Sequence, residues 1–188
     1  MSAWQHWAMT FSRQPESPVT PELVVRDYAE ADYRACRDLW AELTEYHRGI
    51  YGDPSIGGDD PGAGFDGYLA MSQRIGTWVA ESSGRLVGMT GLLHQGSSAE
   101  VEPVVVTGTA RDQGIGRRLV SRVVEEALAR DYEYLAIRPV ARNVAAVRRF
   151  HAIGFRTLGG HIDLTMDLAA RRHDWLQGAS LHDLDFDY

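Results

Sequence analysis

The stretch Arg111–Gly116 constrains the fold more than any other part of this chain. An apolar, strand-like run, Val104–Val106, precedes it, and an amphipathic helix pattern follows it directly. Gly114 and Gly116 therefore stand where a strand turns into the start of a helix. Glycine lets a ligand approach the backbone closely, and the free N–H groups and dipole of a helix N-terminus favour negative charge. The pattern predicts a pyrophosphate-binding turn.

The spacing of this turn excludes two common phosphate-binding motifs. The dinucleotide fingerprint G-x-G-x-x-G requires a third glycine where this chain has Leu119. The P-loop requires a Lys-Ser/Thr pair after its last glycine, and Arg117 and Arg118 stand there. What remains, R-x-x-G-x-G at the start of a helix, resembles the acetyl-CoA-binding motif of the GNAT superfamily of N-acetyltransferases.

A second segment resembles the other signature of the same superfamily. It begins at Asn143, has Ala146 three residues on and the aromatic Phe150 seven residues on, and ends with Gly154 and Phe155. Asparagine is a good helix N-cap, and glycine suits a helix C-terminus. The two matches stand at the expected distance, with a strand pattern between them.

The length of 188 residues suits one domain with a substantial core. The resemblance covers about residues 23–168, which leaves 1–22 as an N-terminal arm and 169–188 as a C-terminal tail. The predicted order is strand, two helices, three antiparallel strands, helix, strand, helix and two strands. The predicted bounds are 23–26, 31–47, 65–73, 77–81, 85–94, 100–106, 115–130, 132–138, 143–152, 155–158 and 161–168. This order predicts an α/β fold, with a mixed, mostly antiparallel sheet and helices on both faces.

The resemblance implies that the two central strands of this sheet splay apart. Pro103 lies in one of these strands and Pro139 ends the other. Proline donates no hydrogen bond and is disfavoured in a fully paired central strand, so the residues independently predict a gap or bulge here.

Composition and charge limit the functional classes. A net charge of −7 argues against a nucleic-acid binder, because such binding depends on basic residues. No apolar run is long enough to span a bilayer, and no signal peptide is recognisable. The single cysteine, Cys36, falls on the apolar face of a helix, which predicts a buried thiol and fits a cytoplasmic protein. The histidines show no metal-binding spacing, so no metal is expected.

The resemblance implies cofactor-binding roles for twelve positions. The N–H groups of 113–117 would bind the pyrophosphate of CoA, nearby arginines would add charge, and Asn143 would contact the pantetheine arm or cap its helix. The positions are Val104, Val105, Val106, Arg111, Gln113, Gly114, Ile115, Gly116, Arg117, Arg118, Asn143 and Phe150.

Glu100 and Glu102 are the candidate catalytic bases, since the family often uses a Glu in the strand before the glycine turn. Two residues apart, they share one face of a strand. Burial beside apolar neighbours would raise the pKa of either carboxyl, which suits a base near neutrality. The alternative is that both face solvent or pair with Arg138. The oxyanion would be held by a backbone N–H at Val105 or Val106.

Phe150 departs from the family pattern. Most members have tyrosine there as general acid to the leaving thiolate, and phenylalanine has no proton to give. His151 should point about 100° away on the helix. Because Phe150 replaces this tyrosine, the alternative hypothesis of an acyl-CoA sensor without turnover stays open.

The resemblance implies that the first two helices and the loop between them wall the acceptor site. The loop's acidic and aromatic residues would suit a cationic amine, although a solvated turn-rich loop is the alternative. These residues are Tyr51, Asp53, Asp59, Asp60, Phe65 and Asp66.

The sequence thus predicts a cytoplasmic N-acetyltransferase that moves acetyl from acetyl-CoA to a primary amine by direct attack in a ternary complex. The amine would be a small cationic molecule or belong to a peptide or protein. The alternatives are the acyl-CoA sensor and a nucleotide-binding α/β protein that shares only the phosphate turn. Trp4 and Trp7 in the arm leave a homodimer open.

Overall fold

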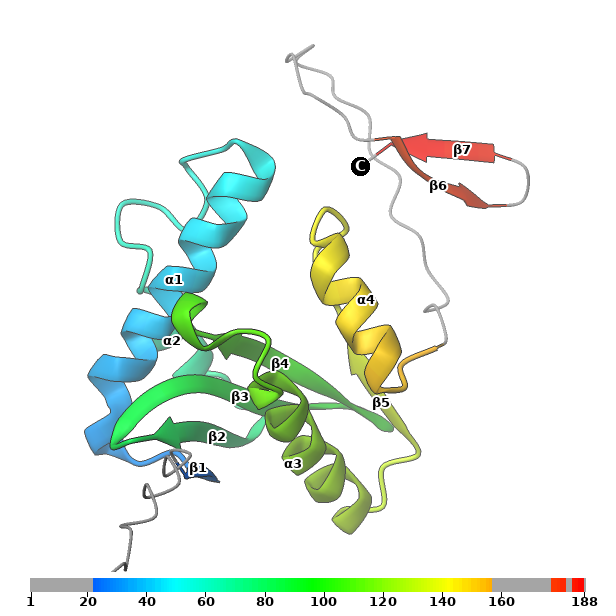
Figure 1. Cartoon of the computed structure of the whole chain (residues 1–188). Helices are drawn as coiled ribbons and strands as arrows, with labels where there is room; N and C mark the ends of the chain where they lie inside the picture. Colours follow the sequence, from blue (N-terminus) through cyan, green and yellow to red (C-terminus); the bar gives the residue numbers. More distant parts are fainter. Residues whose placement is uncertain (1–21, 157–176, 182–183, 188) are drawn as a thin grey trace, which may run out of the picture.

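The computed structural model describes residues 22–156, 177–181 and 184–187. Its five-stranded sheet has the order β1-β2-β3-β4-β5, in which β4 and β5 run parallel and the other neighbours antiparallel (Figure 1). The strands are β1 (Leu23–Asp27), β2 (Arg74–Ser82), β3 (Arg85–Gln95), β4 (Ser98–Val106) and β5 (Tyr134–Ile137), with β6 (Gln177–Leu181) and β7 (Leu184–Asp187) as a separate antiparallel pair. The helices are α1 (Tyr33–Tyr51), α2 (Gly64–Leu69), α3 (Ile115–Ala129) and α4 (Val144–Ile153), with short 3-10 turns η1 (Glu30–Asp32) and η2 (Gly108–Ala110).

The prediction of a mixed α/β sheet is confirmed. Every strand and helix predicted between residues 23 and 152 is present, with its ends shifted by a few residues. Phe155 and Arg156 follow α4 without entering a strand. The rest of the strand predicted at 155–158, the strand at 161–168, almost all of the arm and the first part of the tail lie outside the described residues.

The turn between β2 and β3 shows why the hairpin could be predicted. Ser83 and Gly84 both have positive φ angles, 51° and 73°, and Ser82 pairs with Arg85 across the turn. A two-residue turn with positive φ at both positions matches the twist of an antiparallel pair.

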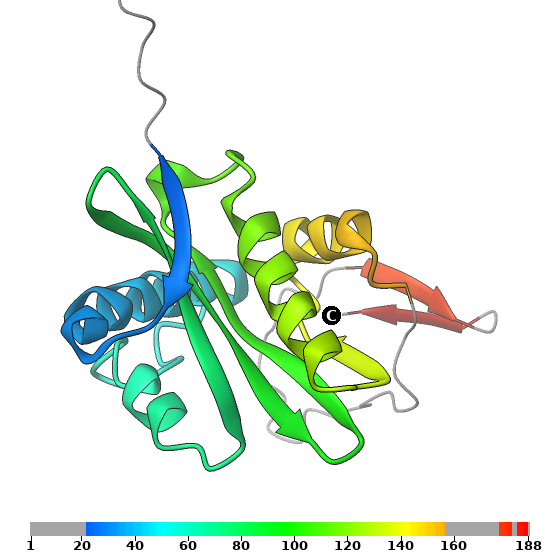
Figure 2. The same ribbon diagram turned by 90° about the horizontal axis from the view of Figure 1, so that it is seen from below.

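Two layers of helix cover the sheet, one on each face (Figure 2). On one face Cys36 of α1 and Phe65 and Tyr68 of α2 pack with Met89 and Leu93 of β3. On the other face Leu119, Val120 and Val123 of α3 are fully buried against the sheet. Burying these apolar side chains supplies most of the stability of such a layered domain.

Cys36 lies in the core, as predicted. Its side chain is fully buried, and burial raises the pKa of its thiol to about 12. The thiol is therefore protonated near neutral pH, which fits a packing role.

The parallel pairing of β4 and β5 is short. It runs from Ser98 opposite Tyr134 to Val101 opposite Ile137, where β5 ends and β4 continues alone on that side. The register between β3 and β4 also shifts between Thr90 and Leu92. The predicted gap near Pro103 is therefore confirmed, and it leaves the second half of β4 open along one edge.

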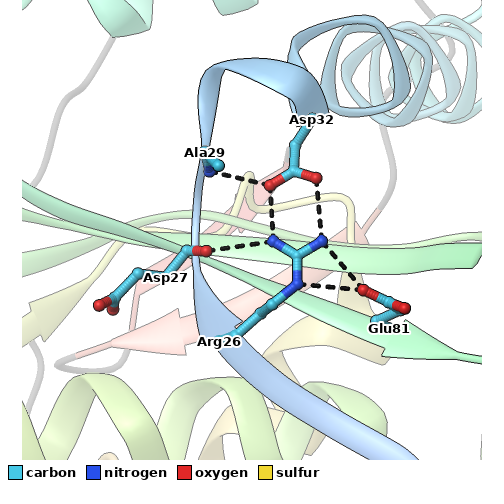
Figure 3. Close-up of polar contacts among 5 residues, drawn as sticks. All are labelled: Arg26, Asp27, Ala29, Asp32 and Glu81. Carbon is cyan, nitrogen blue, oxygen red and sulfur yellow. Dashed lines mark hydrogen bonds and ion pairs between the residues drawn. The ribbon is translucent and has the colours of Figure 1, made fainter. Parts of the chain in front are cut away.

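A charged corner joins β1 to the start of α1 (Figure 3). The Arg26 guanidinium donates to both carboxylate oxygens of Asp32, at 2.7 and 2.9 Å, and its Nε donates to Glu81 at 3.0 Å. Asp32 also accepts from the Ala29 N–H at 2.8 Å. The Arg26 guanidinium holds the pKa of Asp32 below its usual range, so the corner stays ionised near neutral pH.

Candidate functional site

The glycine turn forms as predicted between β4 and α3. Gly114 takes the N-cap position of α3 with a φ of +77°, a conformation that glycine adopts without strain. The first helical hydrogen bond runs from the Arg118 N–H to the Gly114 oxygen at 3.1 Å. The N–H groups of Ile115, Gly116 and Arg117 thus have no partner within the helix, and they are available to an anion.

A cavity of about 340 Å³ opens at this turn. Its walls come from four parts of the chain: α1, the second half of β4, the turn leading into α3, and α4. In Figure 1, α1 and α4 stand on either side of the end of β4. Ten of the twelve predicted cofactor positions line this cavity: Val104, Val105, Val106, Arg111, Gly114, Ile115, Gly116, Arg117, Asn143 and Phe150.

The other two predicted positions, Gln113 and Arg118, are exposed and do not line the cavity. Arg118 is one helical step past Arg117, and a step of about 100° turns its side chain away. The N–H of Arg118 already bonds to Gly114. The lining of the cavity therefore gives no support to a ligand contact by the Arg118 side chain, while the predicted contact through the Gln113 backbone N–H stays a prediction.

Arg111 is fixed by two contacts inside the turn. Its Nε donates to the Val106 oxygen at 3.2 Å, and its guanidinium lies 4.7 Å from the centre of the Tyr46 ring. Arg111 therefore holds the turn against the end of β4. Its Nε–H is committed to this contact, which leaves the other guanidinium N–H groups for a ligand.

Eight further residues line the cavity that were not among the predicted cofactor positions, and three of them, Leu43, Tyr46 and Arg149, carry large side chains from α1 and α4. Leu43 and Tyr46 lie one turn apart on α1, and the helical pattern of α1 indicated its core face but not which far segment the helix would meet. Arg149 pairs with Asp112 at 2.9 Å, and both side chains are exposed. The sequence did not indicate that Arg149 would line the cavity, because the position of α4 beside the glycine turn depends on tertiary packing.

Asn143 and Phe150 stand on α4. The Asn143 side chain accepts from the Ala146 N–H at 3.1 Å, so its capping role is confirmed. The Phe150 ring meets the Phe155 ring edge-on at 6.3 Å between centres. Phe150 thus contributes an apolar ring and no hydroxyl to the cavity wall.

The two candidate bases have different surroundings. Glu100 is buried, pairs with Arg138 and accepts from the Gln95 side chain at 3.1 Å. The alternative of an ion pair with Arg138 therefore holds for Glu100. Burial raises the pKa of Glu102, and the neighbouring Glu100 charge raises it further, whereas Arg138 lowers it. Neither carboxylate lines the cavity.

Both carboxylates belong to the sheet face that carries α1 and α2. Glu100 lies opposite Leu93, which packs with these helices. Burial raises the pKa of the Tyr68 hydroxyl on α2 to about 12, and the nearby Glu102 charge adds to that rise. The prediction that the two share one face agrees with these contacts.

Three of the acidic and aromatic residues that were expected to face a cationic amine have partners within the fold instead. Asp60 and Asp66 both pair with Arg37, and the Tyr33 hydroxyl donates to Asp66 at 2.7 Å. Phe65 is fully buried in the core. The physical reason is that the loop folds back along α1, where Arg37 faces Asp60 and Asp66 and offsets part of their charge.

Asp53 is also engaged within the loop, where it accepts from the N–H and hydroxyl of Ser55 at 2.8 and 2.6 Å. Asp59 remains exposed. Across the described part of the chain, no group of three or more His, Cys, Asp or Glu side chains could hold a metal ion. Across those same residues, no helix has the length and apolar character needed to cross a membrane.

Comparison with known proteins identifies the family. The model of the acetyltransferase (GNAT) family matches residues 26–155. A curated relative, N-acetylaspartate synthetase of Danio rerio, is 29% identical over 91 residues, which are 47% of this chain and 32% of that protein. The chain thus matches about a third of the length of this relative.

Two solved structures show the same fold. The aminoglycoside N-acetyltransferase AAC(6′)-Iy in complex with CoA has a TM-score of 0.58 at 14% identity, covering 80% of this chain and 99% of that one. The ribosomal-protein-S18-alanine N-acetyltransferase from Escherichia coli has a TM-score of 0.57 at 14% identity, covering 73% and 80%. With the family model matching well over half of its length, the chain belongs to the acetyltransferase (GNAT) family.

Proposed function

We propose that this protein transfers an acetyl group from acetyl-CoA to a primary amine, by direct attack of the amine within a ternary complex. One observation carries the proposal: the start of α3, whose first N–H groups have no partner within the helix, and the second half of β4, which is unpaired on the β5 side, line the same cavity. A diphosphate fits the first feature, and a chain of amide groups fits the second. CoA contains both.

The orientation of the β4 backbone supports the place of the pantetheine arm. The Thr107 N–H donates to the Val87 oxygen of β3 at 2.9 Å. Because backbone groups alternate along a strand, those of Val105 point to β3 and those of Val104 and Val106 to the open edge. The Val106 oxygen on that edge accepts from Arg111.

Of the two predicted oxyanion donors, this alternation favours the N–H of Val106 over that of Val105. A fixed N–H that faces the open edge is a donor to the charge that develops on the carbonyl oxygen during attack. Arg111 holds the same peptide segment in place through the Val106 oxygen.

Glu102 is the better candidate for the base. A carboxyl with a raised pKa accepts a proton more readily near neutral pH than an ordinary one. Glu100 is already committed to Arg138 and Gln95. Because Glu102 stands outside the cavity lining, we propose that it takes the proton of the amine from the α1–α2 face of the sheet, directly or through water.

The acceptor is the least constrained part of the proposal. With Asp60 and Asp66 paired to Arg37, the loop does not single out a polycation. The names of the similar proteins refer to an aminoglycoside and an alanine of ribosomal protein S18 as acceptors, and to N-acetylaspartate as a product, so the amines behind them differ widely in charge. The proposal therefore keeps primary amines as a class, small or peptide-borne.

The test is release of CoA thiol from acetyl-CoA in the presence of polyamines, aminoglycosides, amino acids and peptides with free N-termini or lysines. Turnover with any of them is the expected result. Tight binding of acetyl-CoA with no turnover across the panel would instead favour the sensor. Binding of ADP or NAD as tight as that of acetyl-CoA would favour the nucleotide-binding alternative.

A glycine variant tests the cavity directly. A Cβ at Gly116 would lie 3.7 Å from the nearest Val106 side-chain atom, so Gly116→Leu fits the backbone while its longer side chain fills the cavity. We expect loss of acetyl-CoA binding, by about 100-fold or more, with an unchanged melting temperature. Gly49→Leu, on the exposed side of α1 with open space around it, is the matched control. Retained affinity in Gly116→Leu would remove the phosphate assignment.

A further inference from the structure

The proposed reaction needs a proton at its end as well as a base at its start. When the bond from the carbonyl carbon to sulfur breaks, the sulfur leaves with the electron pair as a thiolate. A group that gives this thiolate a proton lowers the barrier to its departure. The cavity wall on α4 offers Phe150 for this purpose, and a phenyl ring has no proton to give.

One residue on the opposite wall has such a proton. Among the side chains that line the cavity, Tyr46 of α1 carries the one phenol. The other polar side chains there belong to arginines, to Asn143 and to Asp112. An arginine does not give up its proton in a protein, an amide is not an acid, and Asp112 is paired with Arg149.

The Tyr46 ring is held in place while its hydroxyl is not. The Arg111 guanidinium lies 4.7 Å from the ring centre, and Arg111 is itself bonded to the Val106 oxygen. The described part of the chain supplies no hydrogen-bond partner for the Tyr46 hydroxyl. A phenol that is fixed by its ring beside the end of β4, with its O–H uncommitted, is arranged to donate to something in the cavity.

We propose, on the basis of the function proposed above, that Tyr46 is the general acid of this protein and replaces the hydroxyl that Phe150 lacks. As the carbon–sulfur bond breaks, the Tyr46 O–H bond breaks with it, and its proton goes to sulfur to give the free thiol of CoA. The tyrosinate regains a proton from solvent, and the proton lost by the amine leaves through Glu102. The products are the acetylated amine and CoA thiol, so atoms and charges balance.

The test compares Tyr46→Phe with the unmodified chain, using an amine that the panel has identified. Because the hydroxyl has no hydrogen-bond partner among the described residues, the variant should keep its stability and the contact of its ring with Arg111. We expect kcat to fall about 100-fold while the KM for acetyl-CoA stays within about twofold. Tyr134→Phe, which removes a hydroxyl from a tyrosine that is 70% exposed on β5, is the matched control.

Two further measurements separate proton donation from simple contact. With the selenium analogue of acetyl-CoA, whose selenolate leaves without help from an acid, the deficit of Tyr46→Phe should shrink to severalfold or less. Adding Phe150→Tyr to Tyr46→Phe should restore at least part of kcat from the other wall.

The outcomes are distinguishable. Unchanged kcat in Tyr46→Phe, a loss confined to KM, or an equal loss with the selenium donor would each overturn the role of Tyr46 while leaving the acetyl transfer intact. A protein that binds acetyl-CoA but turns over no amine would overturn the proposed function and this inference together.

Discussion

The β1–α1 corner and the middle of β4 each place one arginine near two carboxylates, and the two places differ in how the charges are shared. At the β1–α1 corner, Arg26 reaches both Asp32 and Glu81, and Asp32 also accepts a backbone N–H (Figure 3). On β4, Arg138 pairs with Glu100, and Glu102 is left with burial and a like charge beside it.

The difference appears in the direction of the pKa shifts. The pKa of Asp32 is lowered and that of Glu102 is raised, although each stands near an arginine. A carboxylate that receives donors is held as an ion and stabilises the fold, whereas one that is buried without them becomes a better base and costs stability. The comparison therefore separates a structural cluster from one that we propose to be reactive.

The largest expected effect concerns Glu102. In Glu102→Gln the proposed base is lost, and we expect kcat/KM for the amine to fall by roughly 10²- to 10³-fold. The raised pKa of Glu102 means that its contribution to stability is present at low pH and lost as pH rises through that pKa. The variant cannot ionise, so at neutral pH it should be at least as stable as the unmodified protein in a urea titration.

Glu100→Gln is the matched variant for this test. Removing the neighbouring charge should lower the pKa of Glu102 and move the acid limb of the kcat/KM profile to lower pH, with a smaller loss of rate. If Glu100→Gln lost more activity than Glu102→Gln, the assignment of the base would have to be reversed.

The next largest effect concerns the free energy of unfolding and comes from the charged β1–α1 corner. Asp32→Asn removes the carboxylate that Arg26 and Ala29 share, and we expect a loss of roughly 1–2 kcal/mol at neutral pH, since Arg26 is partly exposed and screened. Because the pKa of Asp32 is lowered in the folded state, this stability is present above the usual aspartate range and fades as pH falls through the folded pKa. Denaturant titrations at neutral and acid pH would measure it. A difference between the proteins that stayed constant across pH would contradict the electrostatic account.

The smallest effect concerns the arginine on β4. Arg138 is 64% exposed, and its charge lowers the pKa of Glu102. Arg138→Gln should therefore move the acid limb of the kcat/KM profile upward by only a fraction of a pH unit, because solvent screens an exposed charge. A pH–rate profile checks the direction. A shift to lower pH would show that Arg138 does not act on the base in this way.

Local sequence signals predicted the parts of the fold that depend on neighbours in the chain. Ser82–Gly84 predicted the hairpin, Gly114 predicted the strand-to-helix turn, and Asn143 predicted the N-cap of α4. Each of these rests on a backbone conformation or hydrogen bond formed within a few residues.

The sequence could not predict contacts made between distant segments. Tyr46 lines the cavity because α1 packs beside the turn at Arg111. Phe65 is buried, rather than exposed in the loop after α1, because α2 packs into the core. The charges of Asp60 and Asp66 gave no indication of their partner, since Arg37 is more than twenty residues earlier in the chain. The periodicity of apolar residues indicates which face of a helix or strand is buried, but not which other segment that face packs against.

One contact of α1 has a consequence for how binding events influence one another. The Glu42 carboxylate accepts from the Thr107 hydroxyl at 2.9 Å and from the Gly108 N–H at 3.1 Å, so α1 is tied to the segment that leads into the glycine turn. The same helix continues into the loop that we expect beside the acceptor. Any displacement of α1 by one substrate is thus felt by the segment that holds the other, and thermodynamic linkage makes the influence mutual and equal in size. Glu42→Gln should then weaken the synergy between the two substrates in a binding titration while leaving each cavity wall in place.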